Sequence, residues 1–279
     1  MTAIERWREE LERWAIPPEI VAAAPESPYG FPTELFRTRG EQATGQGDPT
    51  PTITRALEGL PDGGRLLDVG CGGGASSLPL AGRAGVLVGV DAQGDMLDGF
   101  LANARAAGVD AEAVHGRWPD VADRVAPVDV AVAGHVLYNV ADLEPFARGL
   151  ATVARSLVVC ELTERHPLHW MNDLWLRFHN VERPDGPGAA GALEALAELG
   201  HDARMELWSA PARGGGFDRR TDAVALIRRR LCLDSSHDDE VSDALDSRLV
   251  KRDGLWSAGP SDRRLATIWF SSNPGAGSS

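Results

Sequence analysis

The sequence predicts an α/β protein in which a mostly parallel, doubly wound sheet has helices on both faces. After Arg65, short and nearly continuous apolar runs recur as RLLDV, VLVGV, VDVAVA and SLVVC. Such runs are typical of strands that are buried on both faces. Between them lie segments with helical spacing, such as GDMLDGFLANARAAG and ADLEPFARGLATVA. This alternation of strand and helix favours parallel strands joined by crossover helices.

The N-terminus is expected to be an amphipathic helix followed by loops. Thr2 and Glu5 have the spacing of a capping box, and apolar residues then recur at helical intervals until Pro17: Ile4, Trp7, Leu11 and Trp14. Residues 17–51 are rich in Pro, Gly and Thr, with one helical turn expected near Leu35. We expect residues 1–50 to form a cap that closes over the carboxyl edge of the sheet as a lid. The alternative is that the Trp stripe packs against a second subunit.

The remaining residues are divided between one domain, at 51–270, and a flexible tail at 271–279. After the fifth strand we expect a helical insert at about 163–185 and a helix from Gly188 to Leu199. The segments ARMELW and RRLATIWF are expected to be strands, separated by added helices at about 219–250. The tail has low complexity.

Composition excludes several classes of protein. The chain has 28 Lys and Arg against 41 Asp and Glu, a net charge of -13, which argues against nucleic acid as a partner. Arg228 to Arg230 are therefore expected to form a solvated face with ion pairs. Three Cys without metal-like spacing argue against a disulfide scaffold and a thiolate zinc site. No apolar run has the roughly 18 residues of a membrane span, and the N-terminus is charged, so no membrane association and a cytoplasmic location are expected.

The sharpest local signal is the glycine-rich segment LLDVGCGGGASS, residues 66–77, at the end of the first strand and the expected start of a helix. Glycines let the backbone turn tightly and approach a ligand. Gly70, Gly72 and Ala75, with Asp91 further on, also fit the dinucleotide pattern. However, a carboxylate at Asp68 would repel a pyrophosphate and suits an ammonium or sulfonium group.

At these residues the chain resembles the class I S-adenosylmethionine-dependent methyltransferases. The matching segments are LLDVGCGGG, VGVDAQGDML and VDVAVAGHVLYNV, within residues 49–162. The resemblance implies a Rossmann-like sheet of seven strands with the last one antiparallel. It also implies methyl transfer from S-adenosyl-L-methionine to an O, N or C nucleophile of a small molecule, with S-adenosyl-L-homocysteine as product, in a monomer or homodimer. A catalytically silent cofactor-binding partner and, less favoured, an NAD(P)-dependent oxidoreductase are the alternatives.

The resemblance also assigns cofactor contacts. Asp68 and the backbone at Gly70, Cys71 and Gly72 would hold the methionine part, and Asp91 would accept hydrogen bonds from the ribose. The residues expected around the adenine and the sulfur are Ala92, Met96, Gly116, Arg117, Trp118, Gly134 and His135. Two alternatives stay open: Asp91 could only cap the next helix, and Trp118 could be a core aromatic residue. Cys71 is not expected to be a nucleophile.

The sequence predicts less about the acceptor side. His135 and Tyr138 emerge at the carboxyl edge of the fourth strand, so His135 is a candidate general base and Tyr138 a candidate for orienting the acceptor. Lining of the cofactor by His135, and closing of the pocket wall by Tyr138, are the alternatives. His166, His169 and Trp170 are expected to line the acceptor pocket, or else to belong to a Trp-rich core. With His179 on another side of the helix, no metal site is expected.

Overall fold

The computed structural model describes residues 1–29, 49–211, 216–252, 254–260 and 262–272. Its main sheet has seven strands in the order β3-β2-β1-β4-β5-β9-β6. These are β1 (Gly64–Val69), β2 (Ala84–Asp91), β3 (Asp110–His115), β4 (Val128–Gly134), β5 (Ala154–Thr163), β6 (Arg204–Pro211) and β9 (Asp262–Ser271). The last strand, β9, is antiparallel to its neighbours β5 and β6, and the other pairs are parallel. The predicted fold class is confirmed.

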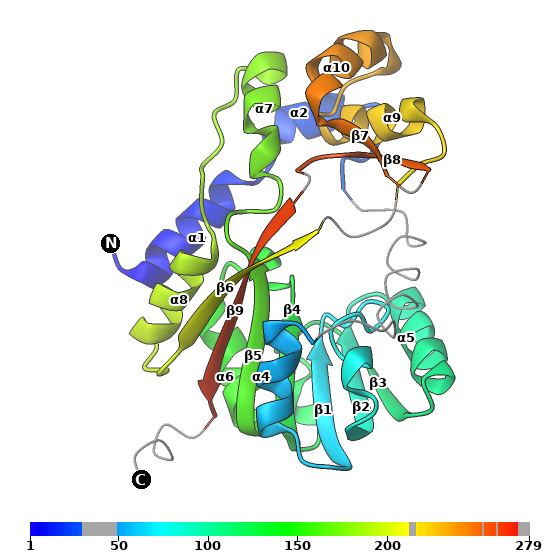
Figure 1. Cartoon of the computed structure of the whole chain (residues 1–279). Coiled ribbons are helices and arrows are strands. Elements are labelled where there is room, and N and C mark those ends of the chain that lie inside the picture. Colours follow the sequence, from blue (N-terminus) through cyan, green and yellow to red (C-terminus); the bar gives the residue numbers. More distant parts are fainter. Residues whose placement is uncertain (30–48, 212–215, 253, 261, 273–279) are drawn as a thin grey trace.

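Helices cover both faces of this sheet (Figure 1). Along β1, Leu67 and Val69 face a core shared with α1 (Ala3–Arg13), α6 (Leu143–Val153) and α8 (Ala189–Glu198). Leu66 faces the opposite core, which includes residues of α4 (Pro51–Gly59) and α5 (Gly94–Ala106). The alternation follows from the two-residue period of a strand, and it explains why the central strands carry apolar residues on both faces.

Helix α1 is anchored to this body by its tryptophans. The capping box is present, since the Glu5 amide donates to the Thr2 hydroxyl and the Thr2 amide donates to the Glu5 carboxylate. Trp7 is 1% exposed, packs in the α6–α8 core and donates its indole N–H to the Val140 carbonyl at 2.8 Å. Trp14 is also buried. Within this chain, therefore, the apolar face of α1 is already covered.

A third buried cluster, which we call the cap cluster, lies beyond the end of the sheet toward which β1 and β6 point (Figure 1). It joins α2 (Pro18–Ala23), α7 (Asn172–His179), α9 (Arg220–Arg230), α10 (Asp238–Ala244) and a hairpin of β7 (Leu249–Arg252) and β8 (Leu255–Ala258). The hairpin was not predicted, although Asp-Gly at 253–254 is a hairpin signal. In the described part of the chain, no helix has the length and apolarity that a bilayer crossing demands. Leu35 and residues 273–279 lie outside the described ranges.

The helix expected directly after the glycine-rich segment was a wrong prediction. Turns follow the glycines, and only Leu78–Leu80 form a short 3-10 helix. Pro79 has no backbone N–H to donate, and Gly82 follows before β2 begins, so the segment is too interrupted for α-helical turns. The glycine loop is therefore not followed by the α-helix whose N-terminus was expected to face the ligand.

The expected solvated face at Arg228 to Arg230 was also wrong for its first residue. Arg228 is 8% exposed, and its guanidinium pairs with Asp238 at 2.8 Å and Glu26 at 3.3 Å. It also donates to the Leu233 carbonyl at 2.8 Å. A buried cation needs such partners, and these link α9 to α10 and to the segment after α2.

Candidate active site

The glycine-rich loop turns back over the ends of β1 and β2. Gly70 has a φ of +68°, a conformation that favours glycine, and its amide donates to the Val90 carbonyl at 2.8 Å. A Cβ atom at this position would lie 2.5 Å from Cγ2 of Val136, in the segment after β4. The loop is thus packed tightly against the β4 end, and only glycine fits at position 70.

Asp91, the last residue of β2, ties three segments together. One carboxylate oxygen accepts from the Gly72 amide at 3.0 Å, and the other accepts from the Gln93 amide at 2.9 Å, just before α5. Its carbonyl accepts from the Gly116 amide at 3.0 Å, at the end of β3. Asp91 therefore fixes the glycine loop and the turn before α5, and because no side chain caps α5, the alternative that Asp91 only caps this helix is not supported.

Asp68 lies beneath the loop and has an unused acceptor. Its side chain is 1% exposed, and Oδ2 accepts from the Ser77 hydroxyl at 2.6 Å. Oδ1 is buried without a hydrogen-bond partner. Burial raises the pKa of Asp68 to about 7, opposed by the Ser77 hydrogen bond and assisted by nearby Asp91. A buried carboxylate with a free lone pair is an acceptor for an ammonium group or an ordered water.

Around the loop, the Gly72 backbone borders open space, whereas the Cys71 and Met96 side chains are buried. A Cβ atom at Gly72 would meet nothing within 4 Å, so this backbone borders open space. Cys71 is 5% exposed, in the α4–α5 core, and burial raises the pKa of its thiol. A thiol of that kind is not a nucleophile. Met96, in α5, is 7% exposed, and Ala92 is exposed next to Asp91.

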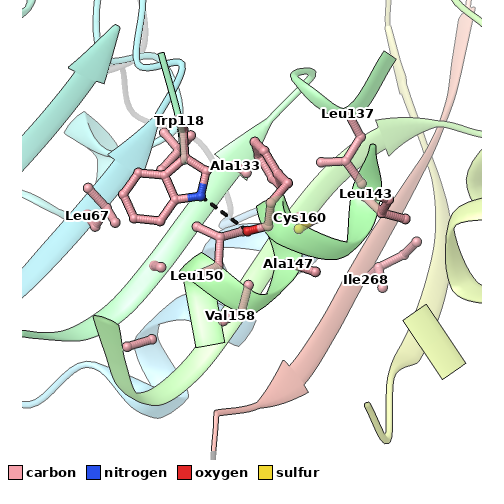
Figure 2. Close-up of a cluster of buried hydrophobic side chains, with 14 of the residues drawn as sticks. Leu67, Trp118, Ala133, Leu137, Leu143, Ala147, Leu150, Val158, Cys160 and Ile268 are labelled. Atoms are coloured by element: carbon pink, nitrogen blue, oxygen red, sulfur yellow. Dashed lines mark hydrogen bonds between the residues drawn. The ribbon is translucent and has the colours of Figure 1, made fainter. Parts of the chain in front are cut away.

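Of the expected adenine contacts at the end of β3, Gly116 and Arg117 are accessible and Trp118 is buried in the core. Gly116 borders the loop through its hydrogen bond to Asp91, and Arg117 is exposed. The Trp118 ring is 7% exposed and donates its indole N–H to the Phe146 carbonyl at 3.2 Å. Figure 2 shows this ring among the side chains of the α6–α8 core. The core alternative for the Trp118 ring is the one that the structure supports.

His135 follows β4 in an unusual conformation. Its φ is +60°, which L-residues rarely adopt, and its amide donates to the Glu161 carbonyl at 2.8 Å. The ring Nε2 lies 3.1 Å from Glu161 Oε1 and 3.1 Å from Arg263 Nη2. Gly134, the residue before it, lies directly against the Ser76 hydroxyl of the glycine loop. The histidine ring is therefore held at the boundary between the loop and the carboxyl ends of β4 and β5.

Glu161, in β5, is part of a buried polar network. It is 7% exposed, and its Oε2 accepts from the Thr52 hydroxyl at 2.7 Å. The Thr52 hydroxyl lies 2.7 Å from that of Thr267, which accepts from the Trp208 indole at 3.0 Å. None of the sequence motifs points to Glu161, although a lone carboxylate within the apolar strand SLVVCELT is a signal that could have identified it.

Tyr138 and His166 form one wall beside this network. The Tyr138 hydroxyl contacts the Thr163 hydroxyl at 2.5 Å and accepts from the Thr163 amide. His166 is 6% exposed, stacks on Trp14 with ring centroids 3.6 Å apart, and meets Tyr138 edge-on at 5.5 Å. Burial lowers the pKa of His166 to about 3, assisted by Arg183 and His169. The ring is therefore neutral at physiological pH.

Of the other expected lining residues, His169 contacts the wall, whereas Trp170 lies apart from it. The His169 ring contacts the His166 carbonyl at 2.9 Å, whereas the Trp170 carbonyl accepts from Arg248 at 2.8 Å in a surface hollow with the β7–β8 hairpin. The His179 ring is within 2.5 Å of the Leu231 carbonyl. In the ranges that the structure describes, no three His, Cys, Asp or Glu side chains converge as a metal site would require.

Comparison with known proteins finds a methyltransferase domain around the glycine loop. Residues 66–158 match the model of a methyltransferase domain. A ubiquinone biosynthesis O-methyltransferase of Azorhizobium caulinodans is 38% identical over 94 residues, covering 34% of this chain and 36% of the relative. One of Rhizobium rhizogenes is 30% identical over 170 residues, covering 54% and 66%. The match thus spans little more than a third of the length of the first relative.

Solved structures agree in fold. A putative methyltransferase of Bacillus halodurans has a TM-score of 0.53 and 14% identity, covering 80% of this chain and 98% of that one. The YcgJ protein of Bacillus subtilis has a TM-score of 0.51 and 15% identity, covering 79% and 97%. With the strand order, these findings show that the chain has the class I methyltransferase fold and carries a methyltransferase domain at residues 66–158.

Proposed function

We propose that this protein transfers a methyl group from S-adenosyl-L-methionine to a small-molecule acceptor and releases S-adenosyl-L-homocysteine. The observation that carries the proposal is the unused, buried Oδ1 of Asp68 beneath a glycine loop whose Gly72 backbone borders open space. This combination fits an ammonium-bearing, amphiphilic ligand and would repel a pyrophosphate. The residues present therefore fit the cofactor of the family.

The contacts that we propose follow the loop outward. Asp68 and the backbone of Gly70, Cys71 and Gly72 would hold the methionine part, and Asp91 would accept from the ribose hydroxyls with the lone pairs that Gly72 and Gln93 leave unused. The adenine would lie near Ala92, Met96, Gly116 and the Arg117 backbone. Gly134 and His135 would border the sulfur. The Trp118 ring is left out of this set because it lies in the core.

The bound cofactor supplies an activated methyl group, so the chain has to align the acceptor, exclude water and remove at most one proton. The curated relatives are named for O-methylation, and we propose an oxygen nucleophile in this protein as well. His135 is the proposed base, because its ring stands at the edge next to the loop. Tyr138 and His166, held by Thr163 and Trp14, would form the acceptor wall.

We further propose that the N-terminal segment covers the acceptor as a lid, since Trp14, within the described residues 1–29, stacks on His166 of that wall. The expected lid residues 30–48 lie outside the described ranges. A monomer is favoured over a homodimer by the burial of Trp7 and Trp14 within one chain. The cytoplasm is the proposed compartment, as Cys71, Cys160 and Cys232 are all free.

Calorimetry tests the proposed cofactor. S-adenosylhomocysteine should bind the wild-type protein, and Asp91→Asn should weaken binding by about 1 to 3 kcal/mol because charged acceptors are lost. Asp95→Asn, an exposed carboxylate in the first turn of α5, is the matched control and should bind as the wild type does. Saturable NAD(P) binding without S-adenosylhomocysteine binding would refute the proposal.

Activity is tested separately with a panel of phenols, enols, carboxylic acids and amines, followed by mass spectrometry for a gain of one methyl group. Methylation of an oxygen is expected. Cofactor binding with no methylation of any acceptor class would instead favour the silent, cofactor-binding alternative.

A further inference from the structure

We propose that Glu161 is a positioning residue that selects the tautomer of His135, placing the ring proton on Nε2 and the lone pair on Nδ1. His135 would then accept the acceptor's proton on Nδ1. This inference rests on the proposed methyl transfer for its chemistry, but the tautomer itself can be measured without turnover.

Glu161 holds His135 at two points. Its backbone carbonyl accepts from the His135 amide at 2.8 Å, and its carboxylate lies 3.1 Å from Nε2. The left-handed φ of +60° at His135 is the conformation in which both contacts are made. Backbone conformations of this kind are found at functional sites, where surrounding contacts maintain them. The pairing therefore orients the ring as well as the chain.

Two groups that favour different protonation states of Nε2 lie beside this ring nitrogen. A carboxylate only accepts hydrogen bonds, so Glu161 favours a proton on Nε2. A guanidinium only donates, so Arg263, at 3.1 Å, favours a lone pair on Nε2. The two contacts are alternatives in a neutral ring, and the stronger one decides the tautomer.

The buried network gives the advantage to Glu161. Thr52 donates to Glu161 Oε2, so its own oxygen is left to accept from the Thr267 hydroxyl, which in turn accepts from the Trp208 indole. Every donor in this series is directed toward the carboxylate, which supports its ionised form. Glu161 is 7% exposed, and a buried anion interacts more strongly with its neighbours than a solvated one.

The neighbouring groups are consistent with a stronger contact from Glu161 than from Arg263. Tyr138 is near both Glu161 and Arg263, and burial raises the pKa of its phenol, so it stays neutral and adds no charge. The Arg263 side chain comes from the beginning of β9, where the strand is only partly buried. Among the described residues, the Glu161 carboxylate and the Arg263 guanidinium each lie 3.1 Å from Nε2 of the imidazole.

In the reaction, the acceptor oxygen gains the methyl group as the carbon–sulfur bond breaks, and its proton passes to Nδ1 of His135. The imidazolium that results is paired with the Glu161 carboxylate through Nε2–H. The proton then leaves to solvent, which the 30% exposed histidine side chain can reach. Neutrality is restored without an oxidant, reductant or further co-reactant.

The test is the nitrogen NMR spectrum of protein with ¹⁵N-labelled histidine, in which the His135 signals are assigned by their loss in His135→Gln. The wild type should show His135 with its proton on Nε2. In Glu161→Gln, Thr52 still donates to the amide oxygen, so the amide NH₂ faces the ring and should move the proton to Nδ1. An unchanged tautomer in folded Glu161→Gln would overturn the proposal.

Two further variants keep the test decisive. Glu164→Gln alters a carboxylate paired with Arg264 at the surface and should leave the His135 signals unchanged. Arg263→Gln removes the competing donor, so in this variant His135 should keep its proton on Nε2. This result tests the proposal even if Glu161→Gln does not fold. A change to the Nδ1–H form in Arg263→Gln would show that Glu161 does not select the tautomer.

Kinetics separate this role from a structural one. In Glu161→Gln, kcat should fall by about 10²- to 10⁴-fold, the contribution of general base catalysis, with S-adenosylhomocysteine affinity within about twofold of wild type. The ascending limb of the pH–rate profile should move to lower pH, because the imidazolium has lost its anion. An unmoved profile would contradict the proposal. A tautomer change in a protein that methylates no acceptor would refute the proposed function and leave the positioning role intact.

Discussion

The loop side of the site, residues 64–116, and the acceptor side, at the ends of β4, β5 and β9, are assembled in different ways. On the loop side the contacts join near neighbours in the chain, such as Asp68 to Ser77 and Gly72 to Asp91. On the acceptor side they join distant segments, such as Thr52 to Glu161. The loop side is therefore held largely by contacts between nearby residues of the chain, whereas the acceptor side depends on how distant segments pack.

The two sides also bury ionisable groups of opposite kind. Burial raises the pKa of Asp68 to about 7 on the loop side and lowers the pKa of His166 to about 3 on the acceptor side. Burial thus favours the neutral form of both groups: His166 is neutral at physiological pH, whereas Asp68 changes its charge near pH 7. Acid should consequently weaken ligand binding on one side and the packing of the wall on the other.

Removal of Trp7 should have the largest effect and should leave the loop side intact. Trp7→Ala deletes a fully buried ring and is expected to lower the free energy of unfolding by about 3 to 5 kcal/mol. Trp7→Phe, which loses mainly the hydrogen bond to Val140, should cost less. Urea denaturation measures both. A loss of S-adenosylhomocysteine affinity in folded Trp7→Ala would show that the two sides are coupled.

His166 should make the protein sensitive to acid. Its pKa is about 3 in the folded chain and about 6.5 when unfolded, so only the unfolded chain takes up a proton between these values. The free energy of unfolding is unaffected by this group above pH 6.5 and falls below it, by about 3 kcal/mol at pH 4 and about 5 kcal/mol well below pH 3. His166→Phe keeps the stack on Trp14 and should flatten the fall in stability between pH 6.5 and 4. An identical pH dependence in both proteins would remove His166 as the cause.

Gly70→Ala should damage the loop side through two separate terms. The left-handed φ costs a residue with a Cβ about 1 to 2 kcal/mol, and overlap with Val136 adds about 1 to 3. In Gly70→Ala with Val136→Ala the overlap is relieved, so part of the lost stability should return. Thermal melting of the two variants measures the difference, and equal melting temperatures would mean that Val136 does not restrict the loop.

Asp68 should make cofactor binding depend on pH. Its carboxyl is protonated below about pH 7, and only the ionised form pairs with an ammonium group. Affinity for S-adenosylhomocysteine should therefore fall by up to tenfold for each pH unit below 7, about 1.4 kcal/mol per unit. Calorimetry between pH 5.5 and 8 should show this slope in wild type and a weaker, flatter one in Asp68→Asn. A flat wild-type profile would remove Asp68 from the ammonium contact.

The same contrast explains what could be predicted from sequence. The strands, α1 and the glycine loop were predictable because apolar periodicity, the Thr2–Glu5 pair and glycine spacing are local signals. The 3-10 helix after the loop, the burial of Arg228 and the role of Glu161 in the acceptor network were not. The burial of Arg228 and the role of Glu161 depend on contacts between remote segments, such as Arg228 with Glu26, which spacing along the chain does not reveal. The 3-10 helix follows from Pro79 and Gly82, local signals that the expectation of a full helix overlooked.

The most direct test of the account is the affinity of Gly72→Ala for S-adenosylhomocysteine. Gly72 and Gly108 both have a positive φ, and a Cβ at either would meet nothing within 4 Å, so alanine should cost each about 1 to 2 kcal/mol of stability. Gly108 lies beyond α5, away from the loop, and is the matched control. If the backbone at Gly72 cradles the cofactor, Gly72→Ala should lose at least about tenfold in affinity, or about 1.4 kcal/mol, while Gly108→Ala binds as the wild type does. Equal affinity in the two folded variants would contradict the proposed cofactor site.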